Sequence, residues 1–293
     1  MMGVPIRRFD SLDELAFDTA EPARYVITDS EYSLPLDALF YPRPDSNRLL
    51  VGLHGAEPRG NSTLPKFQFV RSFLSRTESL LFVSDSTLLQ GPDINIGWYA
   101  GNRDTPLVDL MALAAKKAGA TVNAEETILV GHSAGGFAAV LMGSRIPNSR
   151  AISVNGQTVV ERYFPWAVSN LQTFAFPECE NPAEMVLRYG NRLDLRIGLE
   201  HRLETASFTH FGNRSDPSSF GERPHFTLLA EHFGLTELGG ITAHGDALVA
   251  CDWGTQGSGH AMPGSAIPFL NLVLDEGQPS EAITHDVDPR WHR

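Results

Sequence analysis

Short apolar runs rich in β-branched and aromatic residues recur along the chain and alternate with segments of helical periodicity. This alternation is typical of a mostly parallel sheet with helices on both faces, so the sequence predicts an α/β fold with an eight-stranded sheet. The predicted strands are Tyr25–Thr28, Leu36–Tyr41, Arg48–Leu53, Leu80–Ser84, Thr127–Val130, Ala151–Val154, Ser207–Phe211 and Ala247–Cys251.

Three segments between these strands carry helical patterns. Within Pro106–Ala118 apolar residues recur three or four positions apart, and Lys116 and Lys117 fall in the last turn. Gly119 follows directly, so we expect the helix to stop there. The two other predicted helices, which follow the fifth and the seventh strand, are Gly135–Ser144 and His225–Phe233.

The interval from Val159 to Glu204 has no clean period but is rich in aromatic residues. A structureless loop of this length is uncommon in a compact domain, so we interpret residues 159–205 as a partly helical, cap-like insertion. Its aromatic side chains either bind a substrate or pack as a satellite core, and the sequence leaves both alternatives open. We therefore predict a single domain over residues 1–293, with a surface segment from Asp275 onward that includes an unexplained Trp291. The aromatic residues are Tyr163, Phe164, Trp166, Phe174, Phe176 and Tyr189.

Charge and composition narrow the choice of partners. The chain has 293 residues, and 23 Lys and Arg against 35 Asp and Glu leave a formal net charge of −12. An acidic balance disfavours nucleic acid and anionic membranes, because both require a positively charged footprint. No stretch has the apolar length of a signal peptide or a membrane span, and two cysteines, Cys179 and Cys251, fit a reducing compartment. We therefore expect a cytoplasmic protein that binds neither nucleic acid nor membrane.

The strongest chemical signal is the segment from Thr127 to Ala139, TILVGHSAGGFAA. A β-branched strand leads into its Gly-His-Ser-Ala-Gly core and an alanine-rich helix leaves it, which is the strand–turn–helix context of a nucleophile elbow. Glycines at 131 and 135 relieve crowding in such a turn, and Ser133 projects beside the helix N-terminus. The alternative is a glycine-rich turn that only packs tightly or cradles a phosphate, but the G-x-x-x-x-G-K-[ST] and G-x-G-x-x-G patterns are absent.

With eight strand runs, this turn after the fifth and a His-Gly pair after the third, the chain from about Tyr25 to Leu274 resembles the α/β-hydrolase superfamily. Several short stretches also resemble bacterial members tied to surface glycans, namely accessory Sec system glycan O-acetyltransferase-like proteins and capsular polysaccharide biosynthesis proteins. The resemblance implies an α/β-hydrolase fold with a serine nucleophile, and the narrower group implies acyl transfer to a sugar hydroxyl. The stretches are Leu53-His54-Gly55-Ala56, Val83-Ser84-Asp85, Gly97-Trp98-Tyr99-Ala100-Gly101, Gly135-Gly136-Phe137-Ala138-Ala139 and Val154-Asn155-Gly156-Gln157-Thr158.

A serine hydroxyl needs a base to remove its proton, and the superfamily resemblance implies the chain order serine, acid, histidine. His260 follows the last predicted strand in the small-residue loop Gly257–Pro263, which makes it the candidate base. Asp216 follows the seventh strand and is the candidate acid that orients His260 and stabilises its imidazolium. Asp252, which ends the strand leading to the histidine, and Asp85, after the fourth strand, remain alternatives.

The oxyanion of a tetrahedral intermediate requires two fixed N–H donors. We assign them to the backbone amides of Ala134, which follows the nucleophile, and Ala56, in the turn after the third strand. His54 is either a supporting residue or a satisfied histidine at a strand end, and the Trp98–Tyr99 pair either forms a pocket wall or packs. His132 is unsuited to act as base because it is locked in the turn, and we expect it to line the pocket. The predicted substrate-binding residues are His54, Gly55, His132, Trp98 and Tyr99.

The sequence thus predicts a serine hydrolase of the esterase type, which cleaves a small-molecule or glycan carboxylic ester through an acyl-enzyme. An O-acyltransferase acting on a glycan or polysaccharide hydroxyl would use the same residues. A catalytically inert α/β-hydrolase-like binding or assembly protein is the third alternative. We predict no cofactor and no metal, since spacings such as H-E-x-x-H and C-x-x-C are absent. Acyl length and oligomeric state are left open.

Overall fold

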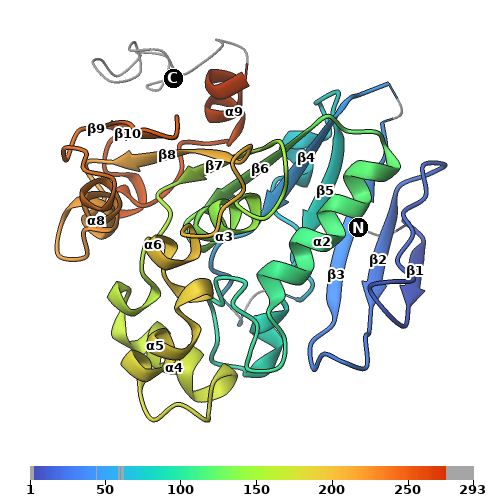
Figure 1. Cartoon of the computed structure of the whole chain (residues 1–293), viewed down its shortest axis with the longest axis horizontal. Helices are drawn as coiled ribbons and strands as arrows, with labels where there is room; N and C mark the ends of the chain where they lie inside the picture. Colours follow the sequence, from blue (N-terminus) through green and yellow to red (C-terminus); the bar gives the residue numbers. More distant parts are fainter. Residues whose placement is uncertain (1–2, 44, 59, 61–62, 275–293) are drawn as a thin grey trace.

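The predicted strands lie in one mixed sheet, seen in a computed structural model that describes residues 3–43, 45–58, 60 and 63–274 (Figure 1). The strands are β1 (Ile6–Phe9), β2 (Ala23–Ile27), β3 (Leu36–Tyr41), β4 (Arg48–Leu53), β5 (Ser79–Val83), β6 (Glu126–His132), β7 (Ser149–Val154), β8 (Ser207–Asn213), β9 (Gly239–Ile241) and β10 (Ala247–Cys251). Their order across the sheet is β1-β2-β3-β5-β4-β6-β7-β8-β10-β9. Pairing is parallel except that β3 runs antiparallel to β2 and β5, and β9 runs antiparallel to β10.

All eight predicted strands are present, but the prediction of an eight-stranded sheet is wrong. Over the described residues the sheet has ten strands, because β1 and β9 extend its two edges. β1 reads Ile-Arg-Arg-Phe and is exposed or half-buried throughout, and β9 is Gly-Gly-Ile. Neither has the buried apolar run that identifies the inner strands, since an edge strand needs only one partner.

Side chains of β4 alternate between two cores, as a strand buried on both faces requires. Leu49, Val51 and Leu53 belong to one buried cluster, and Leu50 belongs to the other. Helices cover both faces, as predicted (Figure 1). They are α2 (Leu107–Thr121) and α3 (Ala134–Gly143) on the first face, and α1 (Val70–Phe73) and α9 (Ile267–Leu274) on the second. None of the described helices combines the length and the apolar character needed to cross a membrane.

The predicted stop of α2 at Gly119 is wrong, because the helix continues to Thr121. Asn123, with φ 53°, adopts the left-handed conformation that ends the helix. The amide of Ala124 donates to Gly119 O over 2.9 Å and that of Asn123 donates to Ala120 O over 3.2 Å. These two bonds form a Schellman motif, in which asparagine takes the position that the sequence suggested for glycine.

The interval 159–205 is largely helical. Proline occupies the first turn of both longer helices, where its missing N–H costs nothing. Phe176 is buried in the core cluster it shares with α3 and packs on Tyr189 at 4.7 Å between ring centroids, whereas Trp166 is 54% exposed. The aromatic residues of the interval 159–205 are therefore divided between core and surface. The segments are η3 (Val160–Arg162), α4 (Pro165–Ala175), α5 (Pro182–Leu193) and α6 (Leu195–Gly198), the last three of which pack together to one side of the sheet (Figure 1).

Three short helices and one longer helix complete the described chain. They are η2 (Ser86–Gln90), α7 (Pro217–Phe220), α8 (His225–His232) and η4 (Gln256–Gly259). The predicted helices after the fifth and the seventh strand correspond to α3 and α8. The surface segment predicted from Asp275, with Trp291, lies outside the described residues.

Candidate active site

Ser133 lies in the sharp turn between β6 and α3. Its backbone has φ 56° and ψ −125°, a strained conformation for a residue that carries a side chain. A Cβ on Gly131 would lie 2.0 Å from the carbonyl oxygen of Gly135, and a Cβ on Gly135 would lie 2.5 Å from that of Leu53. Only glycine fits at these two positions, so the turn is tight and presses α3 against the end of β4.

Three side chains predicted for catalysis lie in one hydrogen-bonded row. His260 Nε2 lies 2.9 Å from Ser133 Oγ, and His260 Nδ1 lies 2.8 Å from Asp216 Oδ2. Ser133 is 3% exposed and Asp216 is 1% exposed. Because the carboxylate accepts the Nδ1 proton, Nε2 of the neutral imidazole is left to accept the proton of the serine hydroxyl. The row is therefore arranged to move a proton from Ser133 to His260.

Asp216 is held as a carboxylate by the turn that it caps. It is the N-cap of α7 and accepts hydrogen bonds from the Ser218 amide and the Ser219 hydroxyl, each over 2.9 Å. Burial opposes its ionisation, but the hydrogen bonds from His260 and Ser218 keep the pKa of this carboxyl below its ordinary value. A negative charge consequently faces Nδ1 of the imidazole.

The two alternative acids lie elsewhere. Asp252 is exposed, and its Oδ1 accepts from the Ser215 hydroxyl over 3.1 Å and from the Gly254 amide over 2.9 Å. Asp85 is buried, and its carboxylate accepts from the amides of Thr87 and Tyr99. Of the three carboxylates considered, the structure brings Asp216 to the histidine.

The loop that carries His260 is fastened by side chains from neighbouring strand ends. Asn155 Nδ2 donates to His260 O over 3.0 Å, and Asn213 Nδ2 donates to Gly259 O over 2.8 Å. His132, predicted to line the pocket, donates from Nε2 to the same His260 carbonyl over 2.7 Å. Burial lowers the pKa of His132 to about 4, so its ring is neutral and holds the loop without adding charge. Within the described ranges, no group of three or more His, Cys, Asp or Glu residues is arranged to hold a metal ion.

The two amides assigned to the oxyanion lie close to the serine. Ala134 is the first residue of α3, so its N–H has no partner within the helix. A Cβ on Gly55, the neighbour of Ala56, would lie 3.5 Å from Ser133 Cβ. Gln68 Oε1 accepts the Gly55 N–H over 3.0 Å and so fixes the turn. Neither assigned amide donates to another group in the described part of the chain, which leaves both available to an oxyanion.

His54 and Tyr99, predicted to bind substrate, lie buried beneath this turn. His54 Nδ1 donates to Gly55 O over 2.8 Å, and its Nε2 accepts the Asp85 amide over 2.9 Å. The Tyr99 hydroxyl accepts the His54 amide over 2.9 Å and donates to Val83 O over 3.0 Å. Burial lowers the pKa of His54, and because Nε2 accepts an amide hydrogen bond, the ring proton lies on Nδ1. The polar atoms of both side chains therefore form hydrogen bonds that fix the backbone.

Two residues near the serine were not among those predicted for the site. Gln157 donates to Ser133 Oγ over 3.2 Å and accepts the indole N–H of Trp98 over 3.0 Å. The Tyr163 ring lies edge-on to Trp98 at 5.5 Å between centroids, and burial raises the pKa of this phenol. In the sequence, Gln157 stood out only as part of the stretch from Val154 to Thr158 that resembles the glycan-linked proteins, and Tyr163 only as one of the aromatic residues of the insertion. Trp98 itself is fully buried.

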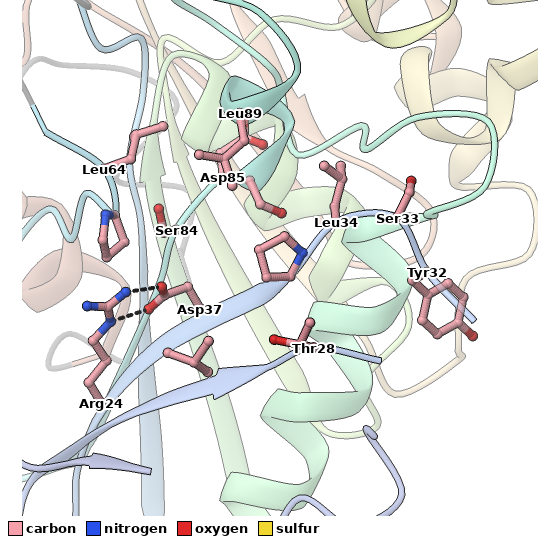
Figure 2. Close-up of a pocket in the computed structure, with 14 residues that line it drawn as sticks. Arg24, Thr28, Tyr32, Ser33, Leu34, Asp37, Leu64, Ser84, Asp85 and Leu89 are labelled. Atoms are coloured by element: carbon pink, nitrogen blue, oxygen red, sulfur yellow. Dashed lines mark hydrogen bonds and ion pairs between the residues drawn. The ribbon is translucent and has the colours of Figure 1, made fainter. Parts of the chain in front are cut away.

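A separate cavity of about 360 Å³ lies at the same edge of the sheet, between the β2–β3 connection and the end of β5 (Figure 2). Arg24 donates to Asp37 with two nitrogen atoms, over 2.8 and 2.5 Å, so the two charges neutralise one another in its wall. Asp85 also lines this cavity (Figure 2) while its amide holds His54. The wall of the cavity is thus continuous with the turn beside the serine.

The mostly parallel sheet with helices on both faces, and a strained serine turn at its carboxyl edge, define an α/β-hydrolase fold. No protein-family model and no curated protein matches the sequence. Among solved structures, the chain is similar to a mutant capsule O-acetyltransferase of Neisseria meningitidis serogroup A in complex with CoA, with TM-score 0.53, 15% identity, and 75% of this chain and 86% of that chain covered. It is also similar to the Glycosylation Associate Protein (Gap123) complex from Streptococcus agalactiae, with TM-score 0.55, 14% identity, and 75% and 40% of the two chains covered. These likenesses concern the fold, and they agree with the O-acetyltransferase-like resemblance of the sequence.

Proposed function

We propose that this protein is a serine hydrolase of the esterase type that cleaves a carboxylic ester through an acyl-enzyme. The observation that supports it is the row of Ser133, His260 and Asp216, with contacts of 2.9 and 2.8 Å in the order that base-assisted nucleophilic attack requires. The substrate class is a small-molecule or glycan ester, which suits a chain of net charge −12 better than a polyanion does.

In this mechanism His260 removes the proton of Ser133 as Oγ attacks the carbonyl carbon of the ester. Asp216 holds the imidazole by Nδ1–H and offsets the positive charge that forms on it. The amides of Ala134 and Ala56 stabilise the oxyanion. His260 then gives its proton to the departing alcohol, and water repeats the sequence on the acyl-enzyme to release the acid.

Residues 159–205 serve in this proposal as a cap within a single catalytic domain. Their contribution near the nucleophile is Tyr163, whose ring packs edge-on against the buried Trp98, and Trp98 in turn bonds to Gln157 beside Ser133. A cap at this place limits the size of the acyl group and the entry of the acceptor.

An O-acyltransferase acting on a glycan hydroxyl is the second candidate. The observation that favours it is the likeness to a capsule O-acetyltransferase. Incubation with p-nitrophenyl acetate and an added oligosaccharide separates the two candidates. Acetylated saccharide in excess of free acetate supports the transferase, whereas acetate alone supports the hydrolase.

The serine mechanism itself is tested with a fluorophosphonate probe, which labels only an activated serine. We expect the wild-type protein and a Ser75→Ala control to be labelled, and Ser133→Ala to be unlabelled. Ser75 lies away from the site, where its hydroxyl donates to Ser72 O. Absence of labelling of the folded wild-type protein would overturn the proposal and favour the inert binding protein.

A further inference from the structure

The hydroxyl of Ser133 receives a second hydrogen bond that the row of three residues does not explain. Gln157 Nε2 donates to Ser133 Oγ over 3.2 Å, and Gln157 is completely buried. It lies three residues beyond the end of β7, the strand that pairs with β6. A buried amide is consequently aimed at the oxygen atom that would carry the acyl group.

The orientation of this amide is set by Trp98. The indole Nε1–H donates to Gln157 Oε1 over 3.0 Å. An indole nitrogen can only donate, so the atom that faces it must be the carbonyl oxygen of the glutamine. The NH₂ group of Gln157 therefore points to Ser133, and Oγ accepts from it.

Trp98 is in turn fixed by the backbone around it. Trp98 and Tyr99 have φ values of 51° and 57°, a conformation that side chains rarely adopt. The Asp85 carboxylate accepts the Tyr99 amide over 2.9 Å, and a Cβ on Gly97 would lie 2.6 Å from the same oxygen atom. The indole is held in a constrained loop, so the donor on Ser133 is preorganised before any substrate arrives.

We propose that Gln157 is a catalytic residue that stabilises Ser133 Oγ as the leaving group when the acyl-enzyme breaks down, and that Trp98 is the residue that positions it. This inference rests on the proposed acyl-enzyme function. It adds a donor for the oxygen of the serine, distinct from the backbone amides assigned to the carbonyl oxygen of the substrate.

Deacylation is the step that uses this donor. The acceptor, water or an alcohol, gives its proton to His260 Nε2 while its oxygen bonds to the acyl carbon. The tetrahedral intermediate then collapses, the bond between the acyl carbon and Oγ breaks, and the electron pair goes to Oγ. His260 returns the proton to Ser133, and the acid or the new ester leaves. Negative charge develops on Oγ in this collapse, where an N–H donor from Gln157 is strongest.

Acylation gains much less from the same bond. The free Ser133 hydroxyl already accepts this bond before it attacks, so the bond stabilises the starting state of acylation as well as its transition state. The ester oxygen of the acyl-enzyme is a weaker acceptor and gains the bond only as the acyl group leaves. Removal of the amide should therefore slow deacylation more than acylation. This asymmetry separates a role in catalysis from a merely structural role, which would weaken both steps alike.

Stopped-flow kinetics with p-nitrophenyl acetate measure the two steps separately, as the burst and the steady-state release of nitrophenolate, while mass spectrometry of the intact protein measures acetylated enzyme. The variants are Gln157→Met, which removes the donor, and Trp98→Phe, which removes the indole N–H that orients it together with part of the buried ring. Trp166→Phe is the matched control, because Trp166 lies exposed on α4.

For Gln157→Met we expect deacylation to slow by about 10²-fold, the usual effect of removing one such donor, with acylation changed by less than about tenfold. Acetylated protein should then accumulate, and Trp98→Phe should show the same bias to a smaller degree. Equal slowing of both steps, or decay of the acetyl-enzyme at the wild-type rate, would overturn the inference. If Gln157→Met fails to fold, an unchanged ratio of the two rates in Trp98→Phe overturns it alone. Failure of the proposed function is seen separately, as a wild-type protein that forms no acetyl adduct on Ser133.

Discussion

Acid should destabilise this protein through a histidine that plays no part in the proposed chemistry. His210 on β8 is fully buried, with Nδ1 3.0 Å from Ser153 Oγ and no partner for Nε2 among the described residues. Burial lowers the pKa of His210 from 6.5 to about 4. Between these values the unfolded chain binds the proton and the folded chain does not, so stability falls as pH falls. pH 5 lies 1.5 pH units below the pKa of 6.5 in the unfolded chain, which corresponds to about 2 kcal/mol lost from the free energy of unfolding.

Urea denaturation at pH 7 and pH 5 tests this reasoning. The His210→Gln variant cannot take up the proton, so its free energy of unfolding should fall by about 2 kcal/mol less between the two pH values than that of the wild type. Thr209→Ser, on the same strand, is the control, because it changes packing without a titratable group and should lower stability equally at both pH values. Parallel profiles for the wild type and His210→Gln would refute the argument.

The remaining predictions concern the candidate site. Asp216→Asn should lower kcat of ester hydrolysis by about 10⁴-fold while Asp252→Asn leaves it near the wild-type value, and the opposite ranking would reassign the acid. Asn155→Ala removes the buried amide that holds the His260 carbonyl, so stability should fall by about 1–3 kcal/mol, seen in calorimetry as a lower Tm. The kcat should fall as well, and an unchanged kcat would show that this contact does not position the loop. Gly131→Ala places a methyl group 2.0 Å from a carbonyl oxygen of α3, so we expect little folded protein by circular dichroism, and a stable, labelled variant would contradict the strained turn.

The inner strands could be predicted from the chain itself, and the three residues of the row from the chain order that the resemblance to the α/β-hydrolase superfamily implies, combined with the geometry of the sheet. Apolar runs identify the strands, and the carboxyl ends of parallel strands meet at one edge of a sheet. A serine after β6, an aspartate after β8 and a histidine after β10 are then neighbours although 127 residues separate Ser133 from His260. The catalytic roles assigned to them stay predictions.

Other features depend on contacts that no local pattern records. Gln157 reaches the serine only because β7 lies beside β6 and because a loop in a left-handed conformation places Trp98 behind it. His54 and Tyr99 were expected at the substrate but lie buried, since their side chains form hydrogen bonds with backbone groups at the strand ends. The edge strands β1 and β9 were not predicted, because a strand that pairs on one side only does not require a buried apolar run.

The fastening of the His260 loop has a consequence for how activity would be lost on heating. The loop is joined to the sheet by the side chains of Asn155, Asn213 and His132 rather than by a strand ladder. Breaking these few bonds opens the loop at a free energy well below that of unfolding the sheet. Inactivation should therefore precede the main thermal transition, and residual activity would measure the stability of one loop rather than that of the whole chain.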